Sequence, residues 1–491
     1  RITIMVSSVR SNFLWNLLLN ISGYLYSILT FPYVTRVLGA EGLGIASFAL
    51  SIVDYAILLA SLGISAVGIR YIAQNSDDEK KRTELFNGLT SIHLTLSLVL
   101  LLIYLLFVTY IPQLSEYKTL YWIGGTKILF NVFLVEWLFQ GMQDFRYITL
   151  RTLFIRTLYI LGVFLFVRDR GDYDNYFYVT IGQIAINATI NWKYSRRYAR
   201  FKYSIRKCKE YLFPILSMGI DKILLSFYAT FNVLFLGFSC GNLAVGYYTA
   251  AIKLYTIILS VIVAFNSVFV PYLNDIYAKG NLNAFREIII RSIRLISTVS
   301  IPLIVGGIIL APQIIMLVAG SGYENAVFPF RVILIQVLFV GLAQVFKDQI
   351  LLTYKKFKQI LFVTCLTTSL SLLMIVILVP HYAEKGTALA VAVPHLIEII
   401  MFTHYARKCI DIPPIYQHLA TNCLISVPII VICEIAKTYI NHYVIVLVTA
   451  IIISFIYWTF VKFYIIKDTL LLDQIKKIIC QVVPKRTGSL D

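Results

Sequence analysis

Charge is scarce in this sequence. Only 14% of its 491 residues are Asp, Glu, Lys or Arg, whereas a soluble domain carries about 25%. Hydrophobic residues make up 59% of the chain, and the mean hydropathy is +0.80. The hydrophobic residues form long blocks between short polar breaks. A helix of about 20 apolar residues is long enough to span a bilayer. The composition therefore excludes a soluble globular protein and predicts an all-α polytopic membrane protein.

Motifs for metal binding and catalysis are also lacking. The sequence has no HExxH, no nucleophile elbow and no glycine-rich phosphate loop. The cysteines form no Cys-x-x-Cys pair and no metal-ligand spacing, so we expect small buried hydrophobes at Cys208, Cys240, Cys365, Cys409, Cys423, Cys433 and Cys480. We expect no cofactor and no metal. A membrane enzyme is the less favoured alternative, because such enzymes commonly need a sizeable exposed loop and every predicted outer loop is short.

The apolar blocks predict fourteen membrane spans. They cover residues 12–34, 43–65, 85–110, 118–139, 148–168, 175–194, 213–237, 243–270, 288–310, 325–346, 358–379, 384–405, 419–438 and 442–465. The first block follows a short basic leader without a small-residue cleavage site, and we expect it to remain as a span. The predicted organisation is an N-terminal six-helix bundle (1–194), a basic cytoplasmic linker (195–212), a C-terminal six-helix bundle (213–405), and two extra helices with a cytoplasmic tail (406–491).

Basic residues are distributed unevenly between the two sides of the predicted spans. With a cytoplasmic N-terminus, 33 of the 43 Lys and Arg residues fall in or near inside segments and 8 fall outside. Such a bias predicts that both termini are cytoplasmic. It also accounts for most of the net charge of +18, so nucleic-acid binding is not expected. The run "KYSRRYARFKYSIRKCK" at 193–209 is interpreted as a topology anchor near anionic lipid, with binding of a substrate headgroup as the alternative.

A weak internal repeat joins the two halves. Segment 41–58 aligns with segment 241–258 at an offset of 200 residues, which matches Leu43 to Leu243, Ile52 to Ile252 and Tyr55 to Tyr255. The match falls between the second and eighth spans, as a repeat of six spans requires. Repeats of this kind build transporters that hold their substrate at the repeat interface.

Four of the predicted spans carry stripes of polar or small residues on one helical face. These stripes are Asn12, Asn16 and Asn20 in the first span; Ser47, Ser51, Asp54, Ser61 and Ser65 in the second; Ser217, Asp221, Tyr228 and Asn232, beside Lys222, in the seventh; and Gly246, Ala250, Lys253, Ser260, Ala264 and Ser267 in the eighth. Close helix packing is one interpretation of the small residues. Lining of a polar cavity is the other.

Charged side chains inside spans are costly, so they favour an interior position or a partner charge. For Lys253 three roles remain open: a cavity residue, a member of a salt bridge, or a side chain that extends to the outer interface. Arg36 is either an interfacial anchor or a cavity residue, and Lys127 is a further basic cavity candidate. Glu136 is expected in an ion pair at the inner end of its span. His395 and Glu398 are spaced to pair with each other, and a proton relay is the alternative.

Several segments resemble a known family. They include "TRVLGAEGLG" (35–44) and "WLFQGMQDFRYI" (137–148), within the longer stretches 19–52, 58–74 and 135–160. These resemble the polysaccharide transporter branch of the multidrug/oligosaccharidyl-lipid/polysaccharide exporter superfamily, which includes the Wzx-type O-antigen flippases.

The resemblance implies two six-helix bundles in a V-shaped, MATE-like arrangement plus two C-terminal helices, in the bacterial inner membrane. Its first, second, seventh and eighth helices would line a central cavity. The implied substrate is an undecaprenyl-pyrophosphate-linked oligosaccharide, and the implied drive is H⁺ or Na⁺ antiport. Bilayer lipids, a polysaccharide polymerase and chain-length proteins are the implied partners.

The charges suggest a role for each candidate residue. The basic group would offset the pyrophosphate and acidic sugars, and it comprises Lys253, Lys222, Lys127 and Arg36. The hydroxyl-binding group comprises Asn12, Asn16, Asn20 and Ser51. Asp54 or Asp221 would bind the coupling cation or hold the lysines while the cavity is empty. A multidrug or cation antiporter is the alternative, although its cavity should be acidic and the charges here are mixed. A purely structural assembly factor would not need a charged interior.

Overall fold

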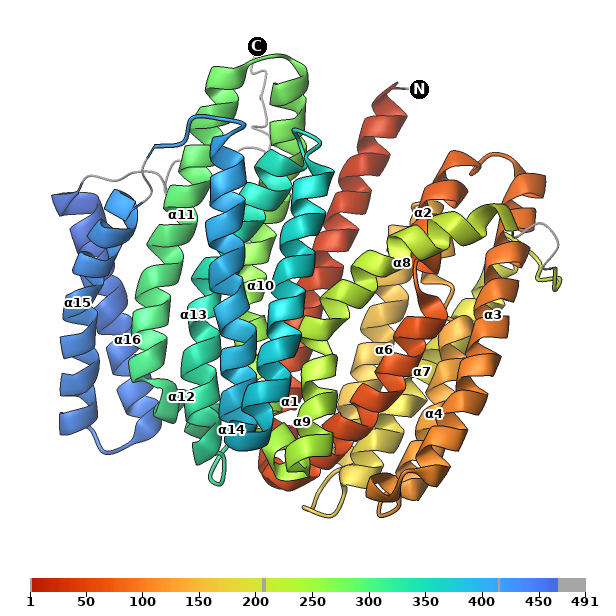
Figure 1. Ribbon diagram of the computed structural model, residues 1–491, viewed down its shortest axis with the longest axis horizontal. Coiled ribbons are helices and arrows are strands. Elements are labelled where there is room, and N and C mark those ends of the chain that lie inside the picture. Colours follow the sequence, from red (N-terminus) through yellow and green to blue (C-terminus); the bar gives the residue numbers. More distant parts are fainter. Residues whose placement is uncertain (1, 205–208, 414–415, 467–491) are drawn as a thin grey trace, which may run out of the picture. The chain divides into compact units, whose positions relative to one another are not determined.

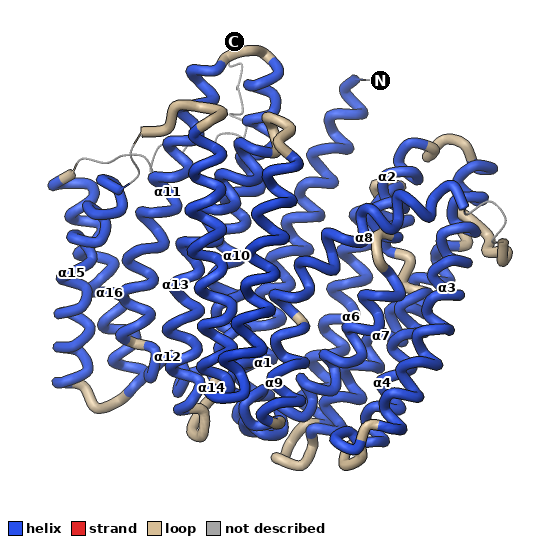
Figure 2. The backbone as a smooth tube through the Cα atoms, viewed as in Figure 1, coloured by secondary structure: helices blue, strands red, loops and turns tan. Residues whose placement is uncertain are grey.

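The computed structural model describes residues 2–204, 209–413 and 416–466, and every regular element in these ranges is helical (Figures 1 and 2). Ten helices in this part of the chain are long and apolar enough to cross a membrane. Two of them, which contain residues 14–61 and 357–407, each consist of two helices joined at a sharp break. The prediction of an all-α polytopic membrane protein is confirmed, and the helices are consistent with fourteen crossings.

The chain divides into two compact units. Unit 1 comprises residues 1–250, 318–326 and 368–390, and unit 2 comprises residues 251–317, 327–367 and 391–491. The helix α10 (Asn242–Ala278) begins in unit 1 and continues in unit 2. The helix α14 (Phe357–Arg407) contributes its middle part to unit 1 and both of its ends to unit 2.

Unit 1 is built around the long helix α1. Its other elements are α2 (Ile64–Gln74), α3 (Glu79–Tyr110), the short turn η1 (Pro112–Leu114), α4 (Lys118–Val132), α5 (Glu136–Gly141), α6 (Phe145–Phe166), α7 (Tyr173–Ser195), α8 (Lys209–Ala229), α9 (Phe231–Cys240) and the turn η2 (Glu324–Ala326). The helix α1 (Ile2–Ser61) packs against α3, α4, α6 and α7. Neighbours among these four also pack against one another, as Figure 1 shows.

Unit 2 is centred on α11 (Leu282–Ile309). Its other elements are α12 (Ala311–Val318), α13 (Val327–Gln344), the π-helix η3 (Val345–Leu351), α15 (Tyr416–Tyr439), α16 (Tyr443–Phe460) and the π-helix η4 (Val461–Ile465). Helix α11 packs against α13 and α15, and α15 packs against α16. Residues of α15 and α16, among them Ile429, Cys433 and Ala450, form one small buried apolar cluster.

Two glycines break helices at corresponding places in the two halves. Gly39 interrupts α1 with φ 69° and ψ −179°. Gly241 separates α9 from α10 with nearly the same angles, φ 82° and ψ 179°. This region of backbone space is accessible essentially to glycine alone. Gly241 lies 202 residues after Gly39, so the two breaks place the repeat in a register of 202 residues.

A reciprocal backbone contact confirms this register. A Cβ atom on Gly44 would lie 1.8 Å from the carbonyl oxygen of Asn242, and a Cβ atom on Gly246 would lie 1.8 Å from that of Ala40. Asn242 and Gly246 follow Ala40 and Gly44 by 202 residues each, so the two contacts are equivalents of each other. The predicted repeat is therefore present, but its offset of 200 residues was wrong by two. Identical apolar residues fit several registers of an apolar helix, whereas glycines at a break or a close crossing fit one.

Candidate functional site

A charged pair lies inside unit 1, between α1 and α4. The ammonium of Lys127 donates to Asp54 Oδ1 at 2.5 Å. The Lys127 side chain is only 10% exposed, whereas the Asp54 side chain is 47% exposed. The carboxylate therefore offers an accessible face while it neutralises a buried cation. The structure brings together two residues that the sequence assigned to substrate binding and to ion coupling.

The other predicted polar residues of α1 differ in accessibility. Ser51 is buried, and its hydroxyl donates to the carbonyl oxygen of Phe48 at 2.7 Å. Asn16 and Asn20 are exposed and bond to each other, with Asn20 Nδ2 donating to Asn16 Oδ1 at 3.3 Å. Asn12 is half-buried. The asparagines thus present amide groups on an accessible face, while the hydroxyl of Ser51 is occupied within its own helix.

Arg36 is exposed near the end of the first part of α1. Its Cγ atom lies close to Gly320, where an added Cβ would come within 3.2 Å. Thr35 donates to the carbonyl oxygen of Val318 at 3.1 Å, and the hydroxyl of Tyr323 donates to that of Thr35 at 3.1 Å. Segment 318–326 is therefore attached to unit 1 at this end of α1.

A pocket of about 380 Å³ opens at the same end of unit 1. Its polar lining includes Glu41 and Arg170, and its aromatic lining is the edge-to-face pair Tyr117 and Tyr173, with ring centroids 5.8 Å apart. In the loop that carries Arg170, the backbone N–H groups of residues 168 and 169 donate to Asp172 and hold the pKa of that carboxyl below its ordinary value. Rings combined with charges of both signs suit a polar ligand that carries hydroxyl groups.

Lys253 is exposed on α10, beside the exposed Thr256. The opposite face of the helix is buried at Tyr248, Leu254 and Tyr255. Gly246 and Ala250 on the predicted strip are also buried, so exposure does not follow the strip along the helix. The role of Lys253 in substrate binding stays a prediction. The side chains of Asp221 and Lys222 lie outside the described residues.

The resemblance segment 137–148 forms a tight corner between α5 and α6. Asp144 caps α6, with its Oδ1 accepting from the backbone N–H of Tyr147 at 3.3 Å. Its Oδ2 accepts from the hydroxyls of Tyr194 at 2.8 Å and Tyr198 at 2.7 Å. Tyr147 and Tyr194 also stack with ring centroids 3.6 Å apart. One carboxylate thereby joins the corner to the end of α7.

Two glycines let this corner fit closely against α2. An added Cβ on Gly68 would lie 2.5 Å from the Trp137 ring, and one on Gly141 would lie 2.7 Å from the Ile72 side chain. The resemblance stretches 58–74 and 135–160 therefore meet in space. Their residue types are explained by packing and capping.

A buried arginine joins α5, α6 and α7 next to this corner. Arg151 donates to Glu136 Oε1 at 2.7 Å and to Asn191 Oδ1 at 2.5 Å, and Asn191 Nδ2 donates to the carbonyl oxygen of Leu134 at 2.5 Å. The Arg151 side chain is only 3% exposed. The prediction that Glu136 forms an ion pair is confirmed. The sequence did not identify Arg151 as the partner of Glu136, since 15 residues and a turn separate the two and no helical spacing signals their contact.

The predicted pairing of His395 with Glu398 is also confirmed. His395 Nδ1 lies 2.8 Å from Glu398 Oε2, one helical turn apart on α14. Both side chains are largely buried, at 15% and 16% exposure. A role of this pair in proton transfer stays a prediction.

Comparisons with known proteins identify the family. The model of the family described as polysaccharide biosynthesis protein matches residues 9–277, which is more than half of the chain. The chain belongs to this polysaccharide biosynthesis family. This family member is 25% identical over 420 residues to a protein of Escherichia coli (strain K12) that is named as an O-antigen transporter. The alignment covers 82% of this chain and 97% of that relative.

Solved structures share the fold of this polysaccharide biosynthesis family member. The lipid II flippase MurJ, in an inward closed conformation, is 13% identical with a TM-score of 0.76, covering 95% of this chain and 99% of that one. An inward-facing multidrug resistance MATE family transporter of the MOP superfamily is 14% identical with a TM-score of 0.61, covering 81% and 96%. The predicted MATE-like fold class is thereby confirmed. The prediction of a transporter rather than an enzyme agrees with the names of these proteins.

Proposed function

We propose that this protein is a flippase for undecaprenyl-pyrophosphate-linked oligosaccharide, the repeat unit of an O-antigen or capsule. It moves this lipid from the cytoplasmic to the outer leaflet of the bacterial inner membrane. The observation that carries the proposal is the family match over residues 9–277, together with a relative named for O-antigen transport that aligns over nearly its whole length. The MurJ-like fold supports a membrane architecture suited to a large amphipathic lipid.

The charges suggest how the headgroup is accommodated. A pyrophosphate cannot enter the hydrocarbon region without compensation, because isolated charges are costly there. Lys253 and Arg36 are exposed and supply positive charge, and Asn16 and Asn20 offer amide groups to sugar hydroxyls. Lys222 belongs to the same proposed set. The prenyl tail stays in the bilayer while the two halves alternate in access.

Ion coupling is proposed to operate through the pair of Asp54 and Lys127. A proton or Na⁺ that binds the accessible carboxylate of Asp54 weakens its hold on the ammonium of Lys127. Lys127 then becomes available to the anionic headgroup. Asp221 is the second proposed coupling residue. In this scheme the cation binds the carboxylate of the salt bridge and the substrate binds its ammonium.

A chromosomal deletion tests the proposed substrate. Loss of the flippase should abolish surface polysaccharide and accumulate the complete lipid-linked oligosaccharide in the inner leaflet, as measured by lipid extraction and mass spectrometry. Accumulation of a shorter or unmodified glycan would instead indicate an enzyme. Complementation with Lys253→Ala should fail, while Lys279→Ala, which removes an exposed charge just after the same helix, should succeed.

Reconstitution tests the coupling. In proteoliposomes with lipid-linked oligosaccharide, wild-type transport should accelerate when a proton or Na⁺ gradient is imposed. Asp54→Asn should remove this acceleration while the protein remains folded. Full gradient dependence in Asp54→Asn would contradict the coupling role and leave the substrate assignment untouched.

A further inference from the structure

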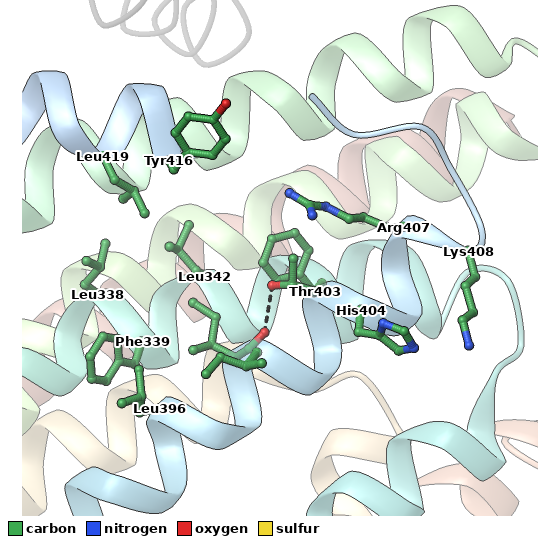
Figure 3. Close-up of a pocket in the computed structure, with 13 residues that line it drawn as sticks. Leu338, Phe339, Leu342, Leu396, Thr403, His404, Arg407, Lys408, Tyr416 and Leu419 are labelled. Carbon is green, nitrogen blue, oxygen red and sulfur yellow. Dashed lines mark hydrogen bonds between the residues drawn. The ribbon is translucent and has the colours of Figure 1, made fainter. Parts of the chain in front are cut away.

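Unit 2 contains an apolar groove that ends in basic side chains. Its volume is about 700 Å³. The walls come from α13, η3, the C-terminal part of α14 and the start of α15, and the residues that matter to the argument are Leu342, Phe346, Ile400, Thr403, Arg407 and Tyr416. Figure 3 shows apolar side chains, among them Leu338, Phe339 and Leu396, toward one end and Arg407, His404 and Lys408 toward the other.

The groove is about as long as one leaflet is deep. Along α14 it runs from Leu396 to Arg407, which corresponds to about 16 Å at 1.5 Å per residue. Half of the hydrocarbon core of a bilayer is about 15 Å. The floor is buried at Leu342 and Phe346, whereas Ile400 on the wall is 60% exposed. Such a groove is open along its side and suits an acyl chain that enters laterally from the bilayer.

The arginine at the basic end of the groove differs from nearby arginines in its pairing. Arg286, at the start of α11, pairs with Asp411 at 2.8 Å, and Arg294 bonds to His418 at 3.1 Å. Within the described ranges, Arg407 has no acidic partner. Figure 3 shows its guanidinium extending over the groove, toward the side of Tyr416. Lys408 instead lies over the Tyr405 ring, with its Nζ 5.6 Å from the centroid.

We propose that this groove binds an anionic glycerophospholipid of the cytoplasmic leaflet. The acyl chains fill the apolar part, and the phosphate binds the guanidinium of Arg407, which suits a phosphate oxygen. The predicted cytoplasmic orientation of this end places it among anionic headgroups, and basic pockets between membrane helices on that side are suited to acidic lipids. The proposal assigns a lipid site separate from the residues proposed to contact the transported oligosaccharide.

Lipid retention by the purified full-length protein tests the proposal. Native mass spectrometry would compare phosphatidylglycerol with phosphatidylcholine, each added to the protein in mixed micelles. The wild-type protein should retain phosphatidylglycerol preferentially. Arg407→Gln should reduce this preference about fivefold, the effect expected for one basic residue near a lipid headgroup. Ile399→Trp, which fills the apolar part, should reduce retention of both lipids.

Arg286→Gln is the matched control, because it removes one positive charge near the start of α15 but off the groove. It should leave the preference for phosphatidylglycerol unchanged. Equal retention of the two phospholipids by the wild-type protein would overturn the proposal. So would equal losses in Arg407→Gln and Arg286→Gln, which indicate a general surface charge effect. Undecaprenyl phosphate displacing phosphatidylglycerol from the wild-type protein but not from Arg407→Gln would assign the groove to the transported lipid.

Discussion

At the residue scale, two buried cations are each paired with an acid that solvent can reach. Lys127 is almost fully buried, while its partner Asp54 is half exposed. Arg151 is likewise buried, with Glu136 partly exposed beside it. In both pairs the acid is the member that water or an ion can reach. The acid is therefore also the member whose neutralisation leaves a buried cation without compensation.

Substitutions in the pair of Asp54 and Lys127 should have unequal effects on stability. Asp54→Asn leaves the buried ammonium unpaired, and we expect it to lower the free energy of unfolding by about 2 kcal/mol, less than for a fully buried pair. Lys127→Met leaves only an accessible carboxylate and should cost less than about 1 kcal/mol. The double variant should resemble Lys127→Met. Denaturant unfolding in detergent measures all three, and equal costs for the two single variants would contradict this account.

Asp144 should be more sensitive to removal than to amidation. Asp144→Ala deletes the helix cap and the acceptor of two tyrosine hydroxyls, for an expected loss of about 2–4 kcal/mol. Asp144→Asn keeps the capping oxygen and should cost about 1 kcal/mol. Thermal unfolding in detergent compares the two variants. If Asp144→Ala unfolds at the wild-type temperature, the carboxylate does not hold α6 to α7.

Sequence patterns located charged residues better than their partners. The cost of a charge inside a span drew attention to Lys127, Asp54 and Glu136, and the spacing of three residues predicted the contact between His395 and Glu398. Contacts between helices have no such spacing. No sequence pattern singles out Arg151 as the partner of Glu136, and the pairing of Asp54 with Lys127 depends on how α1 and α4 pack.

At the element scale, the helices begin, end and break close to where the apolar blocks predict. The predicted span 85–110 corresponds to α3 and the predicted span 148–168 to α6. The break inside α14 lies at Ala383, where φ is 45°. It falls between the predicted spans 358–379 and 384–405, and Pro380 and Gly386 stand on either side of it. The sequence does not signal that the positive φ falls on an alanine rather than on a glycine.

The break at Gly39 permits a test that separates backbone strain from crowding. Nothing lies within 4 Å of a Cβ added at Gly39, yet φ there is +69°. Gly39→Ala should therefore lower stability by about 1–3 kcal/mol through backbone strain alone. Gly182 in α7 also has open space around it but lies in regular helix. Gly182→Ala should raise stability by up to about 1 kcal/mol.

Thermal unfolding in detergent and the yield of folded protein measure the difference between these two variants. Gly44→Ala adds the opposite case, since its Cβ would overlap the carbonyl oxygen of Asn242. It should be the most damaging of the three. Similar unfolding temperatures for Gly39→Ala and Gly182→Ala would show that the break can adjust to a side chain.

At the scale of the whole molecule, composition was the most informative feature of the sequence. The apolar blocks and the segments 35–44 and 137–148 were sufficient to predict the fold class and the family, as the match over residues 9–277 shows. The register of the repeat was not predictable to the residue, because long apolar helices align in several ways. Orientation across the membrane rests on the asymmetry of Lys and Arg between the loops.

Cysteine labelling tests this orientation. In a cysteine-free background, Arg170→Cys lies in the loop between α6 and α7, and Arg197→Cys lies beyond the other end of α7. A membrane-impermeant maleimide should label residue 170 in intact spheroplasts and residue 197 only after the membrane is opened. The reverse pattern would invert the topology and move the groove at Arg407 to the outer leaflet.

The crossing of Gly44 with Asn242 and of Gly246 with Ala40 has a consequence for biogenesis. The ribosome must add 202 residues between the two equivalent glycines, which takes about 10–40 s at 5–20 residues per second. During this interval Gly44 has nothing to pack against at this crossing, because Asn242 has not yet been made. A substitution at Gly44 should therefore leave insertion of the early helices intact and should halt maturation only once Gly246 has been made.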